Sequence, residues 1–163
     1  MPTGSPVKES ILDDLQNTAL PLIAAGAGSG GGDPYYTAVE QITRIEAGPF
    51  ELKMFPAIVI MPLSTTYDNE GTQGTRTIAA TFRIRLSLYL RTRTDAVSKL
   101  ERFIRDTHKA ILVDRTRNNN AVNTRAVSDE AFYPTEDDEA DTTANFVIDI
   151  DYRTPFDDLN TPT

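Results

Sequence analysis

The clearest feature of the chain is a nearly strict alternation of apolar and polar side chains from Thr77 to Arg91. The apolar positions of this stretch are Ile78, Ala80, Phe82, Ile84, Leu86, Leu88 and Leu90. Successive side chains of a β-strand point to opposite faces, so the pattern predicts one long antiparallel strand with a buried and a solvated face. At about 3.3 Å per residue, fifteen residues reach about 50 Å. We therefore expect part of this strand to bend or to extend beyond the domain and pair with a partner.

A protruding β-hairpin is predicted from the residues that precede the long strand. Ala57–Met61 is an apolar run after a proline, which predicts a strand buried on both faces or nearly so. The polar segment Ser64–Arg76 follows it and contains Asp68-Asn69-Glu70-Gly71, which predicts a hairpin tip or a disordered loop. The two strands and this tip together form the hairpin.

Three further segments have the composition of strands. Phe146, Ile148, Ile150 and Tyr152 alternate with more polar residues and predict a final strand. Val39–Glu46 has the β-branched content of a strand, although a short helix also fits it. Beyond a turn at the three consecutive asparagines 118–120, residues 121–127 predict another strand.

Two helices are predicted from apolar residues at helical spacing. Ser5 and Pro6 are typical of a helix start, and the first helix is expected to run from about Pro6 to Leu20. Thr94-Asp95 is expected to cap the second helix, which should cover one face of the sheet. The apolar stripe of this second helix is Val97, Leu100, Phe103, Ile104, Thr107 and Ile111.

These elements predict an α+β fold in a single domain spanning residues 1–163. We expect a mostly antiparallel sheet of about four to five strands, two main helices packed on one face, and the long protruding β-hairpin. A flexible Gly-rich loop is expected at residues 26–34 and a C-terminal arm at 154–163. The predicted core between the sheet and the second helix is Phe82, Ile84, Leu86, Phe103, Ile104, Phe146, Ile148 and Ile150.

The composition limits the classes of protein to which this chain can belong. The chain of 163 residues contains 39 % hydrophobic residues, which fits one ordinary domain. It has no cysteine, so disulfides and thiolate metal sites are excluded, and neither an export signal nor a membrane span is apparent. A net charge of −8 repels phosphate backbones and argues against dedicated nucleic-acid binding.

The residues that could carry chemistry do not form a catalytic or metal-binding motif. A phosphate-binding loop needs Lys-Ser/Thr after its glycines, and Asp33-Pro34 stands there instead. The lone histidine, His108, fits an ordinary surface or boundary position. We therefore expect a protein that is not an enzyme and that needs no cofactor or metal.

An acidic run near the C-terminus is expected to be a solvated loop. It consists of Glu136, Asp137, Asp138, Glu139 and Asp141. The central glycine and later glutamate of an EF-hand-type calcium loop are missing, and the like charges repel one another in any packed arrangement. The run is expected to lie along the lumen of an assembly or on a face that meets a basic partner.

Charged residues also recur at the solvent-facing positions of two predicted strands. Arg83 and Arg85 lie on the long strand, and Asp149 and Asp151 lie on the final one. Antiparallel neighbours can pair such charges across the sheet, which is the structural interpretation. The alternative is a basic stripe that faces an acidic partner or DNA.

The order of elements resembles the tail terminator proteins of long-tailed bacteriophages, a family that includes the lambda-type minor tail protein U. The resemblance starts with the opening helix, which contains Ile11, Leu15 and Leu20, and with the strand Phe55-Pro56-Ala57-Ile58-Val59-Ile60. It continues through the long strand 77–91 and the helix ending in residues 104–111, with Asp114 just beyond. It ends with the strand Ile148-Asp149-Ile150-Asp151-Tyr152-Arg153 before Pro155 and Asp157.

This resemblance implies a structural subunit of the virion that is assembled in the host cytoplasm. Six such subunits would form a ring that caps the tail tube and presents its other side to the head-side connector or stopper protein. DNA would pass through the negatively charged lumen without specific binding. The expected interface residues are Tyr67, Asp68, Asn69, Glu70, Arg76, Arg83, Arg85, Glu136, Asp137, Asp138 and Glu139.

Two other functions are consistent with the same residues. One is a head-completion or stopper protein in the neck of the same particle. The other belongs to a different class, a small non-phage α+β binding module or an enzyme that uses the Gly-rich loop. The mass of the assembled protein separates these classes, since only an assembly subunit forms a discrete ring.

Overall fold

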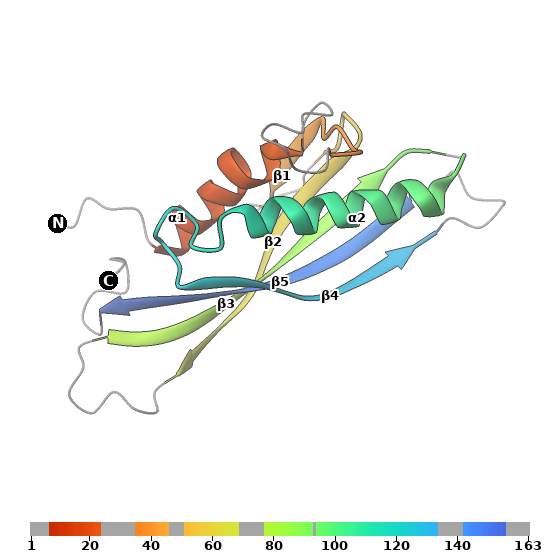
Figure 1. Ribbon diagram of the computed structural model, residues 1–163. Helices are drawn as coiled ribbons and strands as arrows, with labels where there is room; N and C mark the ends of the chain where they lie inside the picture. The colour runs from red at the N-terminus through yellow and green to blue at the C-terminus, as the bar shows by residue number, and fades with distance from the viewer. Residues whose placement is uncertain are drawn as a thin grey trace.

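A mixed five-stranded sheet and two helices form the fold of this α+β protein (Figure 1). The computed structural model describes residues 7–23, 35–45, 51–68, 77–92, 94–133 and 142–155. The strand order is β1-β2-β3-β5-β4, with β1 parallel to β2 and every other pair antiparallel. The strands are β1 (Gln41–Arg44), β2 (Ala57–Asp68), β3 (Thr77–Leu90), β4 (Asn123–Phe132) and β5 (Thr142–Pro155).

The long alternating stretch forms β3, and its predicted parity is confirmed. All seven apolar positions from Ile78 to Leu90 are buried. The expectation that this strand needs a partner outside the domain is wrong. It pairs along its whole length with β5, from Thr77↔Pro155 to Leu90↔Thr142, because β5 is also fourteen residues long. On its other side, β3 pairs with β2.

Strand β2 begins as predicted and ends later than predicted. Its first four residues, Ala57–Ile60, are fully buried, which confirms a strand buried on both faces. Residues 64–68, predicted to belong to the tip or loop, continue the strand beyond a bulge between Pro62 and Ser64. The β-branched and aromatic residues Thr65, Thr66 and Tyr67 suit this extended pairing.

The other strand boundaries also shift. β1 has four residues within the predicted segment 39–46, whereas β4 runs five residues beyond the predicted end at Val127. Thr154 and Pro155, expected in the C-terminal arm, belong to β5. The remaining tip residues 69–76, the Gly-rich loop 26–34, the acidic run 136–141 and the arm from 156 onward lie outside the described residues.

Both helices form where they were predicted. α1 (Val7–Asp14) continues as a π-helical segment, Leu15–Ala19, and a 3₁₀ turn, Leu20–Leu22. α2 spans Ala96–Val113. The expected side-chain cap of α2 is wrong, since Asp95 has φ of 54° and makes no capping hydrogen bond with its side chain. Val97 was predicted to lie on the apolar stripe, but it is 58 % exposed. The buried residues of α2 begin one turn later, at Leu100.

One hydrophobic cluster joins the helices to the sheet. It contains residues of α1 and α2 together with the apolar side chains that alternate along one face of β3 and β5. Figure 1 shows α1 and α2 beside each other over the sheet, with α1 near β1 and β2 and α2 along β5 and β4. All eight residues of the predicted core are buried, which confirms their assigned parities.

Candidate interaction surfaces

Four of the predicted interface residues fall on two strands or at their ends, and the others are not described. Tyr67 and Asp68 end β2, while Arg83 and Arg85 lie in β3. Asn69, Glu70, Arg76 and the acidic residues 136–139 lie outside the described residues. The structure therefore places these residues at one end of the β2–β3 pair and in the middle of β3, and it does not bring them into one site.

Arg83 forms the internal charge pair that its parity predicted. Its Nε lies 2.7 Å from Asp149 Oδ1, and its Nη2 donates to Asp149 Oδ2 at 2.8 Å. This bidentate geometry is the strong form of an arginine–carboxylate contact. Arg125 of β4 joins the group, with Nη1 2.5 Å from Asp151 Oδ2 and Nη2 3.6 Å from Asp149 Oδ2. The prediction that these charges pair with each other across the sheet is therefore confirmed for Arg83.

The predicted charge pairing does not extend to Arg85, which contacts neither Asp149 nor Asp151 in the contacts that the structure records. An antiparallel register that places Arg83 opposite Asp149 places Arg85 opposite Val147. Arg85 Nη2 instead lies 2.6 Å from Met61 Sδ, and Asp151 accepts a hydrogen bond from Thr81 Oγ1 at 2.7 Å. The antiparallel register that places Arg83 opposite Asp149 also places Thr81 opposite Asp151, whereas Met61 lies opposite Arg85 in the β2–β3 register.

Replacing Asp149 with Asn tests this charge pair. Hydrogen bonds from Arg83 hold the pKa of the Asp149 carboxyl below its usual range. A lowered pKa stabilises the folded state above about pH 4, the ordinary carboxyl value, and this contribution disappears as the pH falls through the folded-state pKa. We expect Asp149→Asn to lower Tm by about 2–4 °C at pH 7, and by much less at pH 2.5.

Thermal unfolding between pH 2.5 and 7 measures this difference. Asp129→Asn is a matched control, because Asp129 is an exposed carboxylate of β4. Equal pH profiles for the two variants would show that the Arg83 pair adds no stability.

The ends of β2, β3 and β5 form a partly aromatic surface near the start of α1. Lys8 Nζ lies 6.0 Å from the ring centroid of Tyr67 and 5.7 Å from that of Phe82. Burial, and then the neighbouring Tyr67, raise the pKa of the Tyr152 hydroxyl. Tyr67 itself remains exposed, so this surface presents an aromatic ring and a cation to solvent.

Strand β4 is the more exposed edge of the sheet. Among the described residues β4 pairs only with β5, and its residues from Arg125 to Glu130 are exposed. Val127 sits at a bulge between Ala126 and Ser128 and is 45 % exposed. Phe132 and Tyr133 at the end of the strand are 45 % and 42 % exposed. An unpaired strand edge that carries apolar side chains is a template for pairing with another chain.

A third surface lies on α2 and was not predicted from the sequence. Arg102 Cζ and Arg105 Cζ lie 5.3 Å and 5.9 Å from the ring centroid of Tyr36, and Lys109 Nζ lies 4.7 Å from that of Tyr35. We call these five residues the basic–aromatic surface. The helical spacing of the cations is visible in the sequence, but the tyrosines come from a segment more than sixty residues away, so no local pattern indicates the contact.

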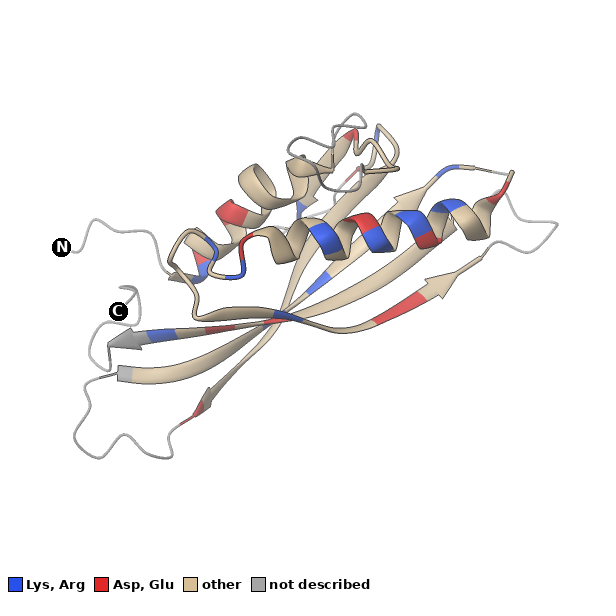
Figure 2. Cartoon of the chain, viewed as in Figure 1, with Lys and Arg blue, Asp and Glu red and all other residues tan. Residues whose placement is uncertain are grey.

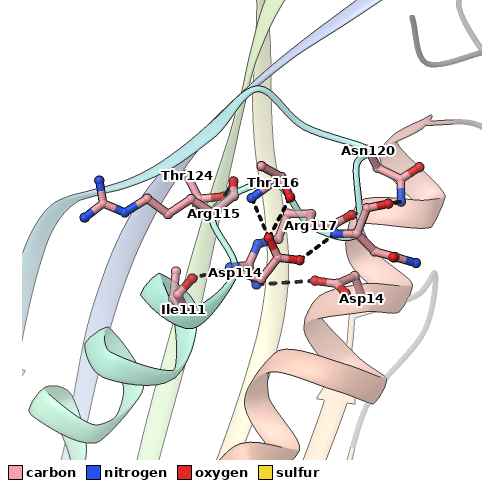
Figure 3. A network of polar contacts seen from close by, with 9 residues as sticks. Asp14, Ile111, Asp114, Arg115, Thr116, Arg117, Asn120 and Thr124 are labelled. Atoms are coloured by element: carbon pink, nitrogen blue, oxygen red, sulfur yellow. Dashed lines mark hydrogen bonds and ion pairs between the residues drawn. The ribbon is translucent and has the colours of Figure 1, made fainter.

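A polar network that was also not predicted ties the end of α2 to α1 (Figure 3). Arg117 is fully buried, and its Nη1 lies 3.3 Å from Asp14 Oδ2 while its Nη2 donates to the carbonyl of Ile111. Burial raises the pKa of Asp14, and Arg117 opposes this rise. The turn that carries Arg117 is held by Asp114, which accepts hydrogen bonds from the backbone and hydroxyl of Thr116.

The described residues hold no group of three or more His, Asp or Glu side chains placed to bind a metal ion. His108 is exposed, as predicted, and its ring centroid lies 5.8 Å from that of Phe146. Within the part of the chain that the structure describes, no helix is long and apolar enough to span a membrane. Comparison of the sequence with protein families and with curated proteins finds no match.

Proposed function

We propose that this protein is a structural virion subunit, the tail terminator of a long-tailed bacteriophage. Its subunits form a ring, hexameric in the family that the sequence resembles, which caps the tail tube and joins it to the head-side connector. The observation that carries this proposal is the exposed edge of β4, a ten-residue strand with exposed Val127 and Phe132 that is followed by exposed Tyr133. Such an edge is suited to contact another copy of the chain.

The two edges of the sheet differ, which supports a ring rather than a two-fold dimer. β1 is four residues long and parallel to its neighbour, whereas β4 is ten residues long and antiparallel. The β1 side is also tied down within the subunit, since Arg44 Nη1 lies 2.8 Å from Glu9 Oε1 of α1. A contact between unlike surfaces is heterologous, and repeated heterologous contacts close into a ring when their rotation permits.

The β2–β3 pair supplies the second contact of the proposed subunit. Its register extends from Ala57↔Tyr89 to Asp68↔Ala79, and Figure 1 shows these strand ends continuing past the helices. In the proposed ring this pair is a protruding hairpin, and Tyr67 and Asp68 contact the tail tube. The lumen of the proposed ring is negative, in keeping with the net charge of −8 per subunit, so that DNA passes without sticking.

A double substitution on β4 tests the proposed ring. We expect Val127→Lys/Phe132→Lys to leave the subunit folded, because both side chains are already exposed, and to abolish ring formation. Size-exclusion chromatography with light scattering, with and without tail tubes, measures the assembled mass. Electron microscopy of the same tubes shows whether their ends are capped.

Val113→Lys/Val122→Lys is the matched control, since Val113 and Val122 are at least as exposed and lie outside the β4 strand. This control should form rings of wild-type mass. A wild-type protein that stays monomeric in the presence of tail tubes would contradict the proposed function. Unchanged rings from the β4 variant would show that β4 is not the subunit interface.

A further inference from the structure

The face of the sheet opposite the helices carries an arginine that has no carboxylate partner among the described residues. Arg85 lies on the face of β3 that points away from the hydrophobic cluster, and it is half-buried. Within the described part of the chain, the only polar contact of its side chain is the one to Met61 Sδ. Its Nε is shielded from solvent and has no hydrogen-bond partner there. A thioether is a weak acceptor, so this guanidinium lacks the anion that a partly buried arginine requires.

The surroundings of Arg85 are apolar but accessible. Directly opposite it stand Met61 on β2 and Val147 on β5, which are both half-buried. Solvent reaches this part of the sheet, since the side chains of Arg83 and Arg125 are 46 % and 50 % exposed. These two arginines already engage the aspartates of this face. Arg85 is therefore a cation set among apolar side chains, an arrangement suited to a partner that brings one carboxylate together with apolar groups.

The edge strand β4 carries the complementary chemistry. Glu130 and Phe132 are both exposed, and their partners on β5 place them on the face of the sheet that points away from the helices. Glu130 forms no ion pair with the other described residues. Figure 2 shows acidic residues in the second half of β4. An acidic and an aromatic side chain about 7 Å apart thus project together from the edge of the sheet.

We propose that Arg85 and the apolar side chains beside it receive Glu130 and Phe132 of a neighbouring copy of this chain. This inference rests on the proposed ring, and it names the unlike surface that the edge of β4 contacts in the next subunit. Glu130 supplies the carboxylate that Arg85 lacks. Phe132 covers the apolar side chains beside the ion pair and excludes water from it. Each subunit gives its β4 edge to one neighbour and offers Arg85 to the other.

Within one subunit, Arg85 and Glu130 are kept apart by the order of the strands. β5 separates β3 from β4, and Val147 of β5 lies directly beside Arg85. The guanidinium lies at Met61 on β2, on the side of β3 that is away from β4. DNA is a poorer occupant than a carboxylate, because a phosphate backbone is bound by several cations and the net charge of −8 repels it.

Two charge reversals, made in separate chains, test this contact. We expect Arg85→Glu to weaken self-association at least about thirtyfold, because a carboxylate then faces Glu130. Glu130→Arg should weaken it equally from the other side of the contact, and it leaves the fold intact because Glu130 is exposed. Size-exclusion chromatography with light scattering over a series of concentrations, with and without tail tubes, measures the mass and the dissociation constant.

An equimolar mixture of the two variants distinguishes a contact between subunits from one within a subunit. In the mixture, Glu130 of the Arg85→Glu chain meets Arg85 of the Glu130→Arg chain, and the two substituted side chains meet each other. We expect the mixture to associate with a dissociation constant within about threefold of the wild-type value. Mixing could not restore an ion pair that forms inside one subunit. A mixture that stays monomeric would overturn the inference.

Neutral variants cover the case in which Arg85→Glu fails to fold. Arg85→Gln, Glu130→Gln and the chain with both substitutions form a double-mutant cycle that introduces no new charge. If the two residues pair across subunits, the loss of association in the doubly substituted chain should be smaller than the product of the two single losses. Losses that multiply, as for independent sites, would overturn the inference.

Glu40→Arg is the matched control, since it makes the same charge reversal at an exposed residue just before β1, on the other edge of the sheet. It should associate as the wild type does, and equal weakening by this variant would overturn the inference. Wild-type rings from Arg85→Glu would also overturn it and would leave the proposed ring in place. Association that mixing restores with the mass of a dimer, and never of a ring, would leave this contact intact and refute the proposed function. A wild-type chain that stays monomeric even with tail tubes would refute both.

Discussion

Arg117→Met is expected to lower the free energy of unfolding by about 3–5 kcal/mol, because it leaves the buried carboxylate of Asp14 without its cation. The carbonyl of Ile111 loses a donor in the same change. Methionine fills much of the space of the arginine side chain, so lost packing is a minor part of the effect. Urea unfolding followed by circular dichroism measures the difference.

The pH dependence of this variant provides an independent check. Burial already raises the pKa of Asp14, so the folded state holds that proton more tightly than the unfolded chain does. A raised carboxyl pKa means that the folded state is more stable with Asp14 protonated. This contribution to the free energy of unfolding is lost as the pH rises from about 3.9, the pKa of an unfolded aspartate, through the higher pKa of folded Asp14. Without Arg117 the folded-state pKa rises further. The deficit of the variant should therefore be smaller at pH 4.5 than at pH 7.

Two further variants separate the ion pair from a general effect of arginine loss. Asp14→Leu/Arg117→Met removes both charges and should recover most of the lost stability. Arg115→Met removes an exposed arginine two residues away and should cost less than about 0.5 kcal/mol. If Arg117→Met itself costs less than 1 kcal/mol, the buried pair does not hold α1 to the end of α2.

Ile84→Asp is expected to unfold the subunit at room temperature. Ile84 is fully buried at the centre of β3, opposite Pro62 of β2 and Ile148 of β5. A carboxylate at this position is buried without a cation, which costs several kcal/mol, and the volume of the isoleucine is lost as well. We expect a loss of more than about 4 kcal/mol, seen as the absence of a cooperative thermal transition.

Val97→Asp makes a similar change, from a β-branched apolar residue to aspartate, at a residue that the helical pattern placed on the apolar stripe of α2. Val97 is 58 % exposed in the first turn of α2, so this variant should melt within about 2 °C of the wild type. Comparable loss in both variants would mean that the first turn of α2 is buried. A stable Ile84→Asp protein would overturn the parity assigned to β3.

The sequence by itself determined which segments form strands and helices, and which face of each is buried. The alternation from Ile78 to Leu90 and the helical stripe from Leu100 to Ile111 are both local patterns. A period of two or of 3.6 residues follows from the geometry of one element, and burial of the apolar face provides most of the stability. For this reason the core and the types of element were predicted correctly. The ends of β2, β4 and β5 were not, because the periodic pattern of a strand does not mark where its pairing with a neighbour stops.

Only the tertiary structure decided which polar groups meet. Arg83 pairs with Asp149 because the β3–β5 register places them opposite each other, and Arg85 contacts Met61 because the β2–β3 register places those two residues opposite each other. Asp106 holds the tyrosines of the basic–aromatic surface across about seventy residues of sequence, and Asp14 meets Arg117 across 103. Each contact is short-ranged and depends on the position of two separate elements, so no pattern within either segment encodes it.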